Sequence, residues 1–137
     1  PLGKADIKRP GRDVSVITYG RMVQMSLQAA AKLAEEGIDV EVLDLRTLSP
    51  LDTDAIIATV KKTGRAVIVH EAVQFAGFGG EIAGVIADSE AFYRLDAPIK
   101  RVGGLYCPVP FNPQLETQSF PTQERIEAAV HSTLQAY

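Results

Sequence analysis

The chain has 137 residues, of which 46% are hydrophobic and 23% charged, and it carries a net charge of −3 at pH 7. These values fit one globular domain with its own core, and scattered Lys and Arg residues on an acidic chain argue against a nucleic-acid-binding protein. No apolar run approaches the ~20 residues of a membrane-spanning helix, and the single Cys107 excludes an internal disulfide and fits a reducing compartment.

Residues 1–12 combine two prolines, two glycines and alternating charges. This composition predicts an interdomain linker or an extended arm. The chain opens on Pro1 rather than on an initiator methionine, and its first residues begin no obvious element. We therefore expect a piece of a longer protein, with a linker at 1–12 and a domain at 13–137.

The domain region alternates regularly between strand and helix patterns. Apolar, β-branched runs predict strands at residues 14–19, 40–45, 66–69 and 99–103. Helical periodicity predicts helices at residues 21–36, 53–63, about 81–89 and about 123–134. Such alternation implies right-handed βαβ crossovers and a mainly parallel sheet covered on both faces, which is a three-layer α/β/α domain.

Local signals add detail to these helices. Residues Val23, Leu27, Ala30 and Ala34 are expected on the buried face of the first helix. Ser49 or Asp52 is expected to cap the second helix, Gly64 to end it, and Thr122 to cap the last. The connection at 91–98 offers Phe92, Tyr93 and Leu95 for packing, and four prolines at residues 104–121 forbid a regular helix there.

Residues 65–86 hold the most informative stretch of the chain. A buried-strand pattern ends in His70 and Glu71, a glycine turn follows at residues 77–80, and a helix pattern comes next. Ligands usually bind at this carboxyl edge of an open α/β sheet. A phosphate loop would need a third glycine where Ile82 stands, and Glu81 would repel a phosphate. The pattern favours a tight turn and a close approach of helix and sheet.

The remaining polar residues do not assemble a catalytic site from the sequence alone. Adjacent residues on a strand point to opposite faces, so His70 and Glu71 are not expected to act as a base and its orienting carboxylate. His131 lies in the last helix and is expected at the surface, and Cys107 has no nearby histidine, so no zinc site is indicated. The acidic residues Asp44, Asp52, Asp96 and Glu116 are spread over loops, and no carboxylate pair that could catalyse hydrolysis stands out among them. These observations predict a binding or assembly domain, in which the proline-rich segment 106–111 packs on a partner.

Several stretches in this order resemble a known family. They are PLGKA at 1–5, VITYG at 16–20, DLRTLSPLD at 44–52, KTGR at 62–65, VHEA at 69–72, GFGGEIA at 77–83 and APIKRV at 97–102. Together they resemble the C-terminal domain of the beta subunit of thiamine-diphosphate-dependent 2-oxo acid dehydrogenases, within the wider transketolase group. The family includes the pyruvate, branched-chain 2-oxo acid and acetoin dehydrogenase complexes, and the run at 44–52 is the most specific.

The resemblance implies a five-stranded sheet with one antiparallel edge strand, so one strand is still to be placed, at residues 7–12 or 105–109. It implies a holoenzyme that uses thiamine diphosphate with Mg, decarboxylates a 2-oxo acid and transfers the acyl group to lipoyl-lysine. The cofactor-activating glutamate belongs to a separate pyrimidine-binding domain, which the linker at 1–12 would follow. No catalytic, cofactor-binding or metal residue is therefore assigned to this chain, which is expected to be inactive alone and to bind no cofactor.

The resemblance also implies partners: an alpha subunit and a second beta subunit in a heterotetramer, and a dihydrolipoyl acyltransferase core. Expected interface residues are His70, Glu71, Phe78, Tyr106 and Phe111. Asp96, Glu116 and Tyr137 are expected to meet a basic docking domain of the core. The location would be the cytoplasm in a bacterium or the mitochondrial matrix in a eukaryote. Two alternatives stay open: a stand-alone nucleotide- or small-ligand-binding domain using residues 77–81, and the same domain of another transketolase-like enzyme.

Overall fold

The computed structural model describes residues 3–73, 77–104 and 121–135, with the backbone alone at 72 and 73. Its centre is a five-stranded sheet with the strand order β1-β3-β2-β4-β5. Strands β2 to β5 run parallel, and β1 pairs with β3 in the antiparallel direction. The strands are β1 (Asp6–Arg9), β2 (Val14–Thr18), β3 (Val40–Asp44), β4 (Ala66–Val73) and β5 (Lys100–Gly104).

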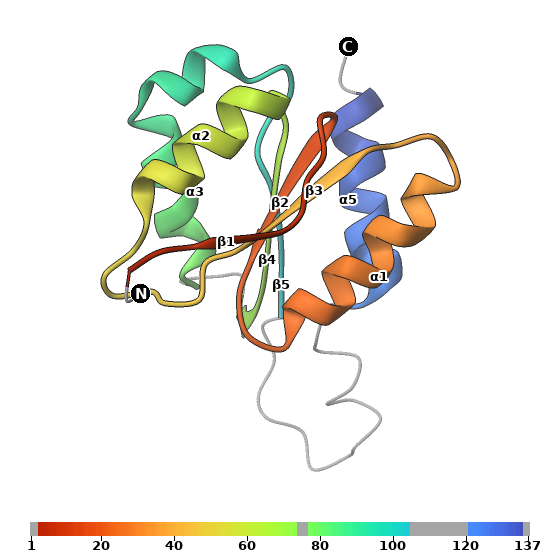
Figure 1. Ribbon diagram of the computed structural model, residues 1–137, viewed down its shortest axis with the longest axis horizontal. Coiled ribbons are helices and arrows are strands. Elements are labelled where there is room, and N and C mark those ends of the chain that lie inside the picture. The colour runs from red at the N-terminus through yellow and green to blue at the C-terminus, as the bar shows by residue number, and fades with distance from the viewer. Residues whose placement is uncertain (1–2, 74–76, 105–120, 136–137) are drawn as a thin grey trace.

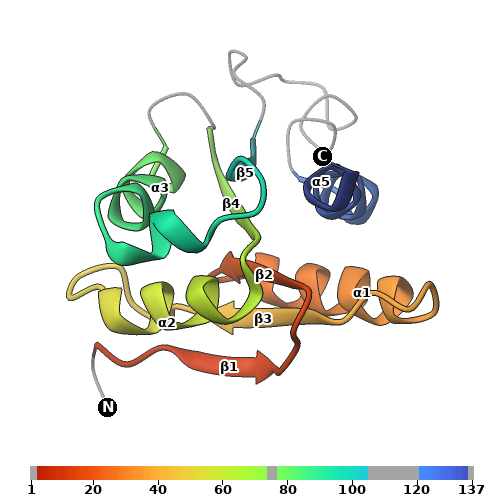
Figure 2. The same ribbon diagram turned by 90° about the horizontal axis from the view of Figure 1, so that it is seen from above.

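Helices cover both faces of this sheet. Figures 1 and 2 show α1 and α5 on one side and α2 and α3 on the other, with the strands between them. The helices are α1 (Met22–Ala34), α2 (Thr53–Thr63), α3 (Gly79–Ala87), the 3-10 turn η1 (Glu90–Arg94) and α5 (Gln123–Gln135). The expected α/β/α fold is confirmed. No helix in the described ranges is both long enough and apolar enough to cross a bilayer.

The fifth strand overlaps the first of the two places expected for it, residues 7–12, and the second place, 105–109, lies outside the described residues. Asp6 pairs with Asp44 and Ile7 with Leu43, so β1 forms an edge of the sheet. The interpretation of residues 1–12 as a linker was therefore wrong over Asp6–Arg9. The sequence DIKR concealed the strand because three of its four residues are charged, which is typical of an edge that discourages pairing with other chains.

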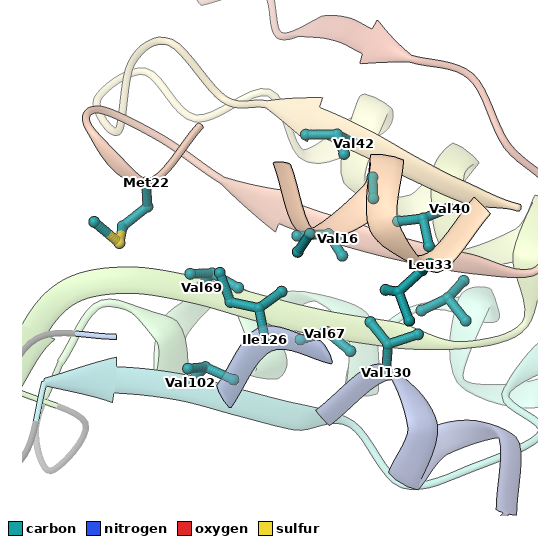
Figure 3. Close-up of a cluster of buried hydrophobic side chains, with 13 residues drawn as sticks. Val16, Met22, Leu33, Val40, Val42, Val67, Val69, Val102, Ile126 and Val130 are labelled. Carbon is teal, nitrogen blue, oxygen red and sulfur yellow. The ribbon is translucent and has the colours of Figure 1, made fainter. Parts of the chain in front are cut away.

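Alternating side chains of the parallel strands build two cores. Val14, Val16, Val67 and Val69 face α1 and α5, whereas Ile17 and Ile68 face α2 and α3. Figure 3 shows the first core, where Leu33 of α1 and Ile126 and Val130 of α5 pack onto the valines. Both faces of β2 are buried along its whole length, which explains why its sequence is mostly apolar or β-branched.

The boundaries of α2 match the expected ones at both ends. Asp52 caps the helix, and its Oδ1 accepts a hydrogen bond of 3.1 Å from the Ala55 N–H. Gly64 closes it with a φ of +76°, a conformation that favours glycine. At α5, Thr122 Oγ1 accepts from the Arg125 N–H at 3.1 Å, so this expected cap is also confirmed.

The expected buried face of α1 was only partly right. Val23 and Ala30 are buried, but Leu27 is half-buried and Ala34 is exposed. The buried face is centred instead on Met22, Ser26, Ala29 and Leu33. Ser26 is a polar residue in the middle of that face, and it interrupts the apolar spacing by which a buried helix face is recognised in a sequence.

The connection before β5 also differs from expectation. Leu95 packs against the second core, but Phe92 and Tyr93 on η1 are 52% and 85% exposed. Their rings meet edge to face with centroids 5.7 Å apart. The 3-10 turn directs both aromatic side chains outward, so they form an exposed patch rather than extra core.

Candidate interface site

The carboxyl edge of the sheet gathers most of the polar residues that follow strands. Because β2, β3, β4 and β5 are parallel, the loops after them meet at one edge, where α1, α3 and α5 begin. Residues 19–21, 45–51, 70–71 and 77–81 come together there. This edge is the first candidate surface.

An ion pair crosses the edge between the loop after β2 and the last residues of β4. Arg21 Nε and Nη2 donate to the two carboxylate oxygens of Glu71 at 2.8 and 3.1 Å, in a two-point geometry. The side chains are 72% and 34% exposed, so the pair contributes at most about 1 kcal/mol to folding. Burial, and then the negative charge of Glu71, raises the pKa of the nearby Tyr19 hydroxyl. The pair therefore adds exposed charge to the surface and little stability to the fold.

His70 and Glu71 point to opposite faces of β4, as expected. His70 is fully buried and lies against the start of α3, whereas Glu71 turns toward the start of α1. A Cβ on Gly79 would stand 2.5 Å from His70 Nε2, closer than side chains tolerate. The glycine turn therefore permits a close approach of helix and sheet, and His70 and Glu71 do not form an acid–base pair.

Two features of the same turn disfavour a bound phosphate. The N–H groups of Gly80 and Glu81 already donate to the carbonyls of Gly77 and Phe78, at 3.1 and 3.0 Å. Glu81 adds a negative charge to the first turn of α3. Within the described residues, no group of three or more His, Cys, Asp or Glu side chains is arranged to hold a metal ion.

Two hollows open at the carboxyl edge. One has a volume of about 610 Å³ and lies between the turn at 48–51 and the start of α3; it is lined by Leu48, Ser49, Leu51, Gly77, Phe78 and Glu81. The other has about 540 Å³ and lies where α1 and α5 begin; it is lined by Arg21, Met22, Met25, Gln28 and residues 121–124. Apolar side chains with a polar rim suit contact with another polypeptide.

The opposite, amino edge holds a buried polar network. Glu41, at 1% exposure, accepts from Lys62 Nζ at 2.7 Å, from Thr59 Oγ1 at 2.6 Å and from the Gly11 N–H at 3.1 Å. Ser15 donates to the Thr59 carbonyl at 2.9 Å. Burial raises the pKa of Glu41, but the bonds from Lys62, Thr59 and Gly11 outweigh it and lower the pKa. This network joins β2, β3 and α2; Glu41 is buried within it, and the Lys62 side chain, which is 44% exposed, covers it on the solvent side.

The expected docking residue Asp96 also lies at the amino edge. Its carboxylate is 61% exposed and stands 3.7 Å from Arg65 Nη1, and its N–H donates to the Gly64 carbonyl at 2.7 Å. The exposed ring pair of Phe92 and Tyr93 precedes it on η1. Asp96 is thus at the opposite end of the sheet from His70, Glu71 and half-buried Phe78. The other expected residues, Tyr106, Phe111, Glu116 and Tyr137, lie outside the described residues.

The sequence did not single out Arg21, Leu48 or Leu51. A signal existed for Arg21, because it comes shortly after β2 and Glu71 lies near the end of β4, but it is readable only once these two strands are known to be neighbours. The two leucines lie in a run whose sequence predicts a turn, and a turn pattern does not indicate an apolar surface.

Comparison with known proteins adds to this geometry. The family described as "Transketolase, C-terminal domain" matches residues 3–126. The chain is 51% identical over 126 residues to the acetoin:2,6-dichlorophenolindophenol oxidoreductase subunit beta of Bacillus subtilis, covering 92% of the chain and 36% of that protein. It is 46% identical over 134 residues to the pyruvate dehydrogenase E1 component subunit beta of the same organism, covering 98% and 41%.

A solved structure described as "Split gene transketolase, inactive beta4 tetramer" superposes with a TM-score of 0.85 at 27% identity, covering 98% of this chain and 43% of that one. The chain thus spans about two fifths of the length of the curated relatives it matches. Both the matched range and the superposition include β1, which belongs to the domain. This chain is a member of the transketolase C-terminal domain family and is similar to that domain in the beta subunits of acetoin and pyruvate dehydrogenases.

Proposed function

We propose that this chain is the C-terminal assembly domain of the beta subunit of a 2-oxo acid dehydrogenase. The observation that carries the proposal is the 44–51% identity with acetoin and pyruvate dehydrogenase beta subunits over 92–98% of the chain. The complete enzyme is an oxidoreductase that decarboxylates a 2-oxo acid and transfers the acyl group to lipoyl-lysine. Thiamine diphosphate with Mg supplies the carbanion chemistry when it is bound in that enzyme.

The domain's own part in this function is to position other parts of the enzyme. In support, the described residues offer a displayed ion pair and two hollows at one edge of the sheet. The N–H groups of Gly80 and Glu81 are engaged internally, so they are not free to bind a cofactor phosphate. We place cofactor activation in a preceding pyrimidine-binding domain.

The proposed partners are an alpha subunit and a second beta subunit in a heterotetramer. Of the expected interface residues at the carboxyl edge, Glu71 and Phe78 are accessible. Arg21 is added to them because it forms an ion pair with Glu71. His70 is fully buried, so its role is to support Gly79 from beneath rather than to touch a partner. Tyr106 and Phe111 remain proposed interface residues.

A separate surface is proposed for the dihydrolipoyl acyltransferase core. Asp96 is 61% exposed and only loosely paired with Arg65 at 3.7 Å, so it is accessible to a basic partner. Glu116 and Tyr137 stay in this proposed set. Asp96→Lys in the assembled enzyme should slow association with the core at low salt, whereas Glu35→Lys, an exposed change at the end of α1, should not. Equal association rates for both variants would remove Asp96 from the set.

The function itself is tested by comparing the chain with the complete enzyme. Decarboxylation of pyruvate, acetoin cleavage and decarboxylation of branched-chain 2-oxo acids should each be assayed with thiamine diphosphate and Mg. We expect no turnover by the chain alone and turnover with one of these substrates once the longer beta subunit and an alpha subunit are combined. Turnover by the chain alone, or none by the combined subunits, would contradict the proposal.

A further inference from the structure

The N-terminal arm of this domain runs backward along the edge of the sheet. Because β1 is antiparallel to β3, its first residue, Asp6, pairs with Asp44 at the carboxyl end of β3. Gly3 reaches the turn beyond that strand, where a Cβ on it would stand 2.9 Å from Pro50 Cγ. Figures 1 and 2 show the start of β1 beside the loop that leads into α2. Residue 3 therefore lies at the carboxyl edge.

A single carboxylate fixes this end of the arm. Asp52 Oδ2 accepts a hydrogen bond of 2.9 Å from the Ala5 N–H, while its Oδ1 caps α2 through the Ala55 N–H at 3.1 Å. The bond from Ala5, more than any other contact, lowers the pKa of Asp52. The arm is thus tied to the start of α2, the helix that begins the second core.

The other end of the arm is tied just as firmly. Arg9 Nη1 donates to the Val40 carbonyl at 2.7 Å, and the Gly11 N–H donates to the buried Glu41 carboxylate at 3.1 Å. A Cβ on Gly11 would be 2.4 Å from the Val40 carbonyl carbon, so the arm crosses β3 in direct backbone contact. Anchors at both ends determine where any polypeptide attached to the front of the chain would leave the domain.

That point of departure lies beside the larger hollow. Leu48, Leu51 and Phe78 line it with half-buried apolar side chains, and Pro50, which Gly3 approaches, lies between the two leucines in the chain. Glu81 is exposed on its rim, and within the described part of the chain its carboxylate forms no ion pair. The hollow suits an apolar side chain next to a Lys, Arg or backbone N–H donor.

We propose that this hollow receives the polypeptide that precedes Pro1 in the longer beta subunit, so that the arm and the hollow together hold the preceding domain in place. This inference rests on the proposed function in requiring such a longer subunit. The relatives support the length that is needed, since the chain covers only 36–41% of them and matches a family described as a C-terminal domain. The second hollow, at the start of α1 and α5, would stay accessible to a different partner.

Thiol labelling tests the location directly. In a Cys107→Ser background, Ser49→Cys and Glu81→Cys place thiols in the lining of the larger hollow. Ala31→Cys, exposed in the middle of α1, is the matched control, and Gln28→Cys reports on the second hollow. Each variant is made in the 137-residue chain and in the longer subunit, its fold is checked by circular dichroism, and its rate of reaction with a maleimide is measured.

We expect labelling at positions 49 and 81 to be about tenfold or more slower in the longer subunit than in the short chain, because burial under a docked segment lowers thiol access. Labelling at position 31 should be equal in both proteins. Equal rates at positions 49 and 81, or slowing at position 28 in their place, would overturn the inference.

The same samples separate this inference from the proposed function, because labelling needs neither the alpha subunit nor the cofactor. If positions 49 and 81 are unprotected while the combined subunits decarboxylate a 2-oxo acid, only the location is overturned. If they are protected in a subunit that supports no decarboxylation, the inference about docking is supported and the proposed function is contradicted.

Discussion

The two edges of the sheet are built in different ways. At the amino edge, Glu41 is buried with hydrogen bonds from three donors, and Ser15 and Thr59 continue the network inward. At the carboxyl edge, the Arg21–Glu71 pair is exposed, and apolar side chains line two hollows. The amino edge satisfies its polar groups internally, as a structural element does, whereas the carboxyl edge leaves polar and apolar groups available to a partner.

This difference indicates where substitutions should affect stability and where they should affect assembly. Buried polar groups in a closed network are costly to disturb because each lost partner leaves a desolvated donor or acceptor. An exposed ion pair contributes little to folding, so changing it should leave the fold intact. The exposed ring pair of Phe92 and Tyr93 with Asp96 is an exception, since it is an accessible patch on the closed edge.

The largest expected effect is at the amino edge. Glu41→Ala removes the acceptor for the Gly11 N–H, Thr59 and Lys62, so unfolding by urea should require about 3 kcal/mol less free energy. The control is Glu71→Ala at the carboxyl edge, where the loss should be about 1 kcal/mol or less. Similar losses for the two variants would abolish the distinction between the edges.

A second effect separates close packing from free surface around α3. Gly79→Ala brings a Cβ to 2.5 Å from the buried His70 ring and should destabilise the domain by roughly 2 kcal/mol. Gly84→Ala in the same helix meets nothing within 4 Å and should stabilise it by up to about 1 kcal/mol. Thermal unfolding of both variants checks the pair, and a stable Gly79→Ala protein would show that His70 does not hold α3 against the sheet.

A smaller effect follows from the ionisation of Glu41. Its pKa in the folded protein lies below the ordinary value of 4.5, so its contribution to stability is complete above that pH and declines as the pH falls through the lowered pKa. Urea midpoints measured between pH 7 and pH 3 should fall less steeply for Glu41→Gln than for the unchanged chain. Parallel curves for the two proteins would mean that Glu41 does not anchor the network.

The smallest expected effect compares two buried serines. Ser26 Oγ in α1 has no hydrogen-bond partner among the described residues, so Ser26→Ala should be neutral or stabilising by up to about 1 kcal/mol. Ser15→Ala should instead cost about 1 kcal/mol, because it removes bonds to Thr59 and Thr63. Chemical denaturation resolves the difference, and an equal loss at both positions would contradict it.

Predictability from the sequence varied with how local the signals were. The ends of α2 could be predicted to the residue because Asp52 and Gly64 act within one turn of the helix. Strand β1 could not, because a segment with three charged residues among its four becomes a strand only when β3 lies beside it. The fold class followed from strand–helix alternation and the family resemblance, both of which the sheet confirms.

The candidate site was harder to predict than the fold. The opposed directions of His70 and Glu71 follow from strand geometry alone, and they were predicted. The Arg21–Glu71 pair depends on β2 and β4 being neighbours, and the hollows depend on how loops pack. Both properties depend on contacts between segments that are distant in the sequence. A local sequence pattern therefore does not indicate Arg21, Leu48 or Leu51.

The most direct test of the central claim, that the carboxyl edge serves assembly rather than chemistry, is calorimetric titration of the isolated chain. Thiamine diphosphate with Mg and, separately, ATP and NAD would be titrated into the folded protein. We expect no saturable binding of any of them, because Glu81 and the internally bonded N–H groups disfavour a phosphate at the glycine turn. One-to-one saturable binding that is strengthened by Glu81→Gln would place a ligand at that turn and contradict the claim.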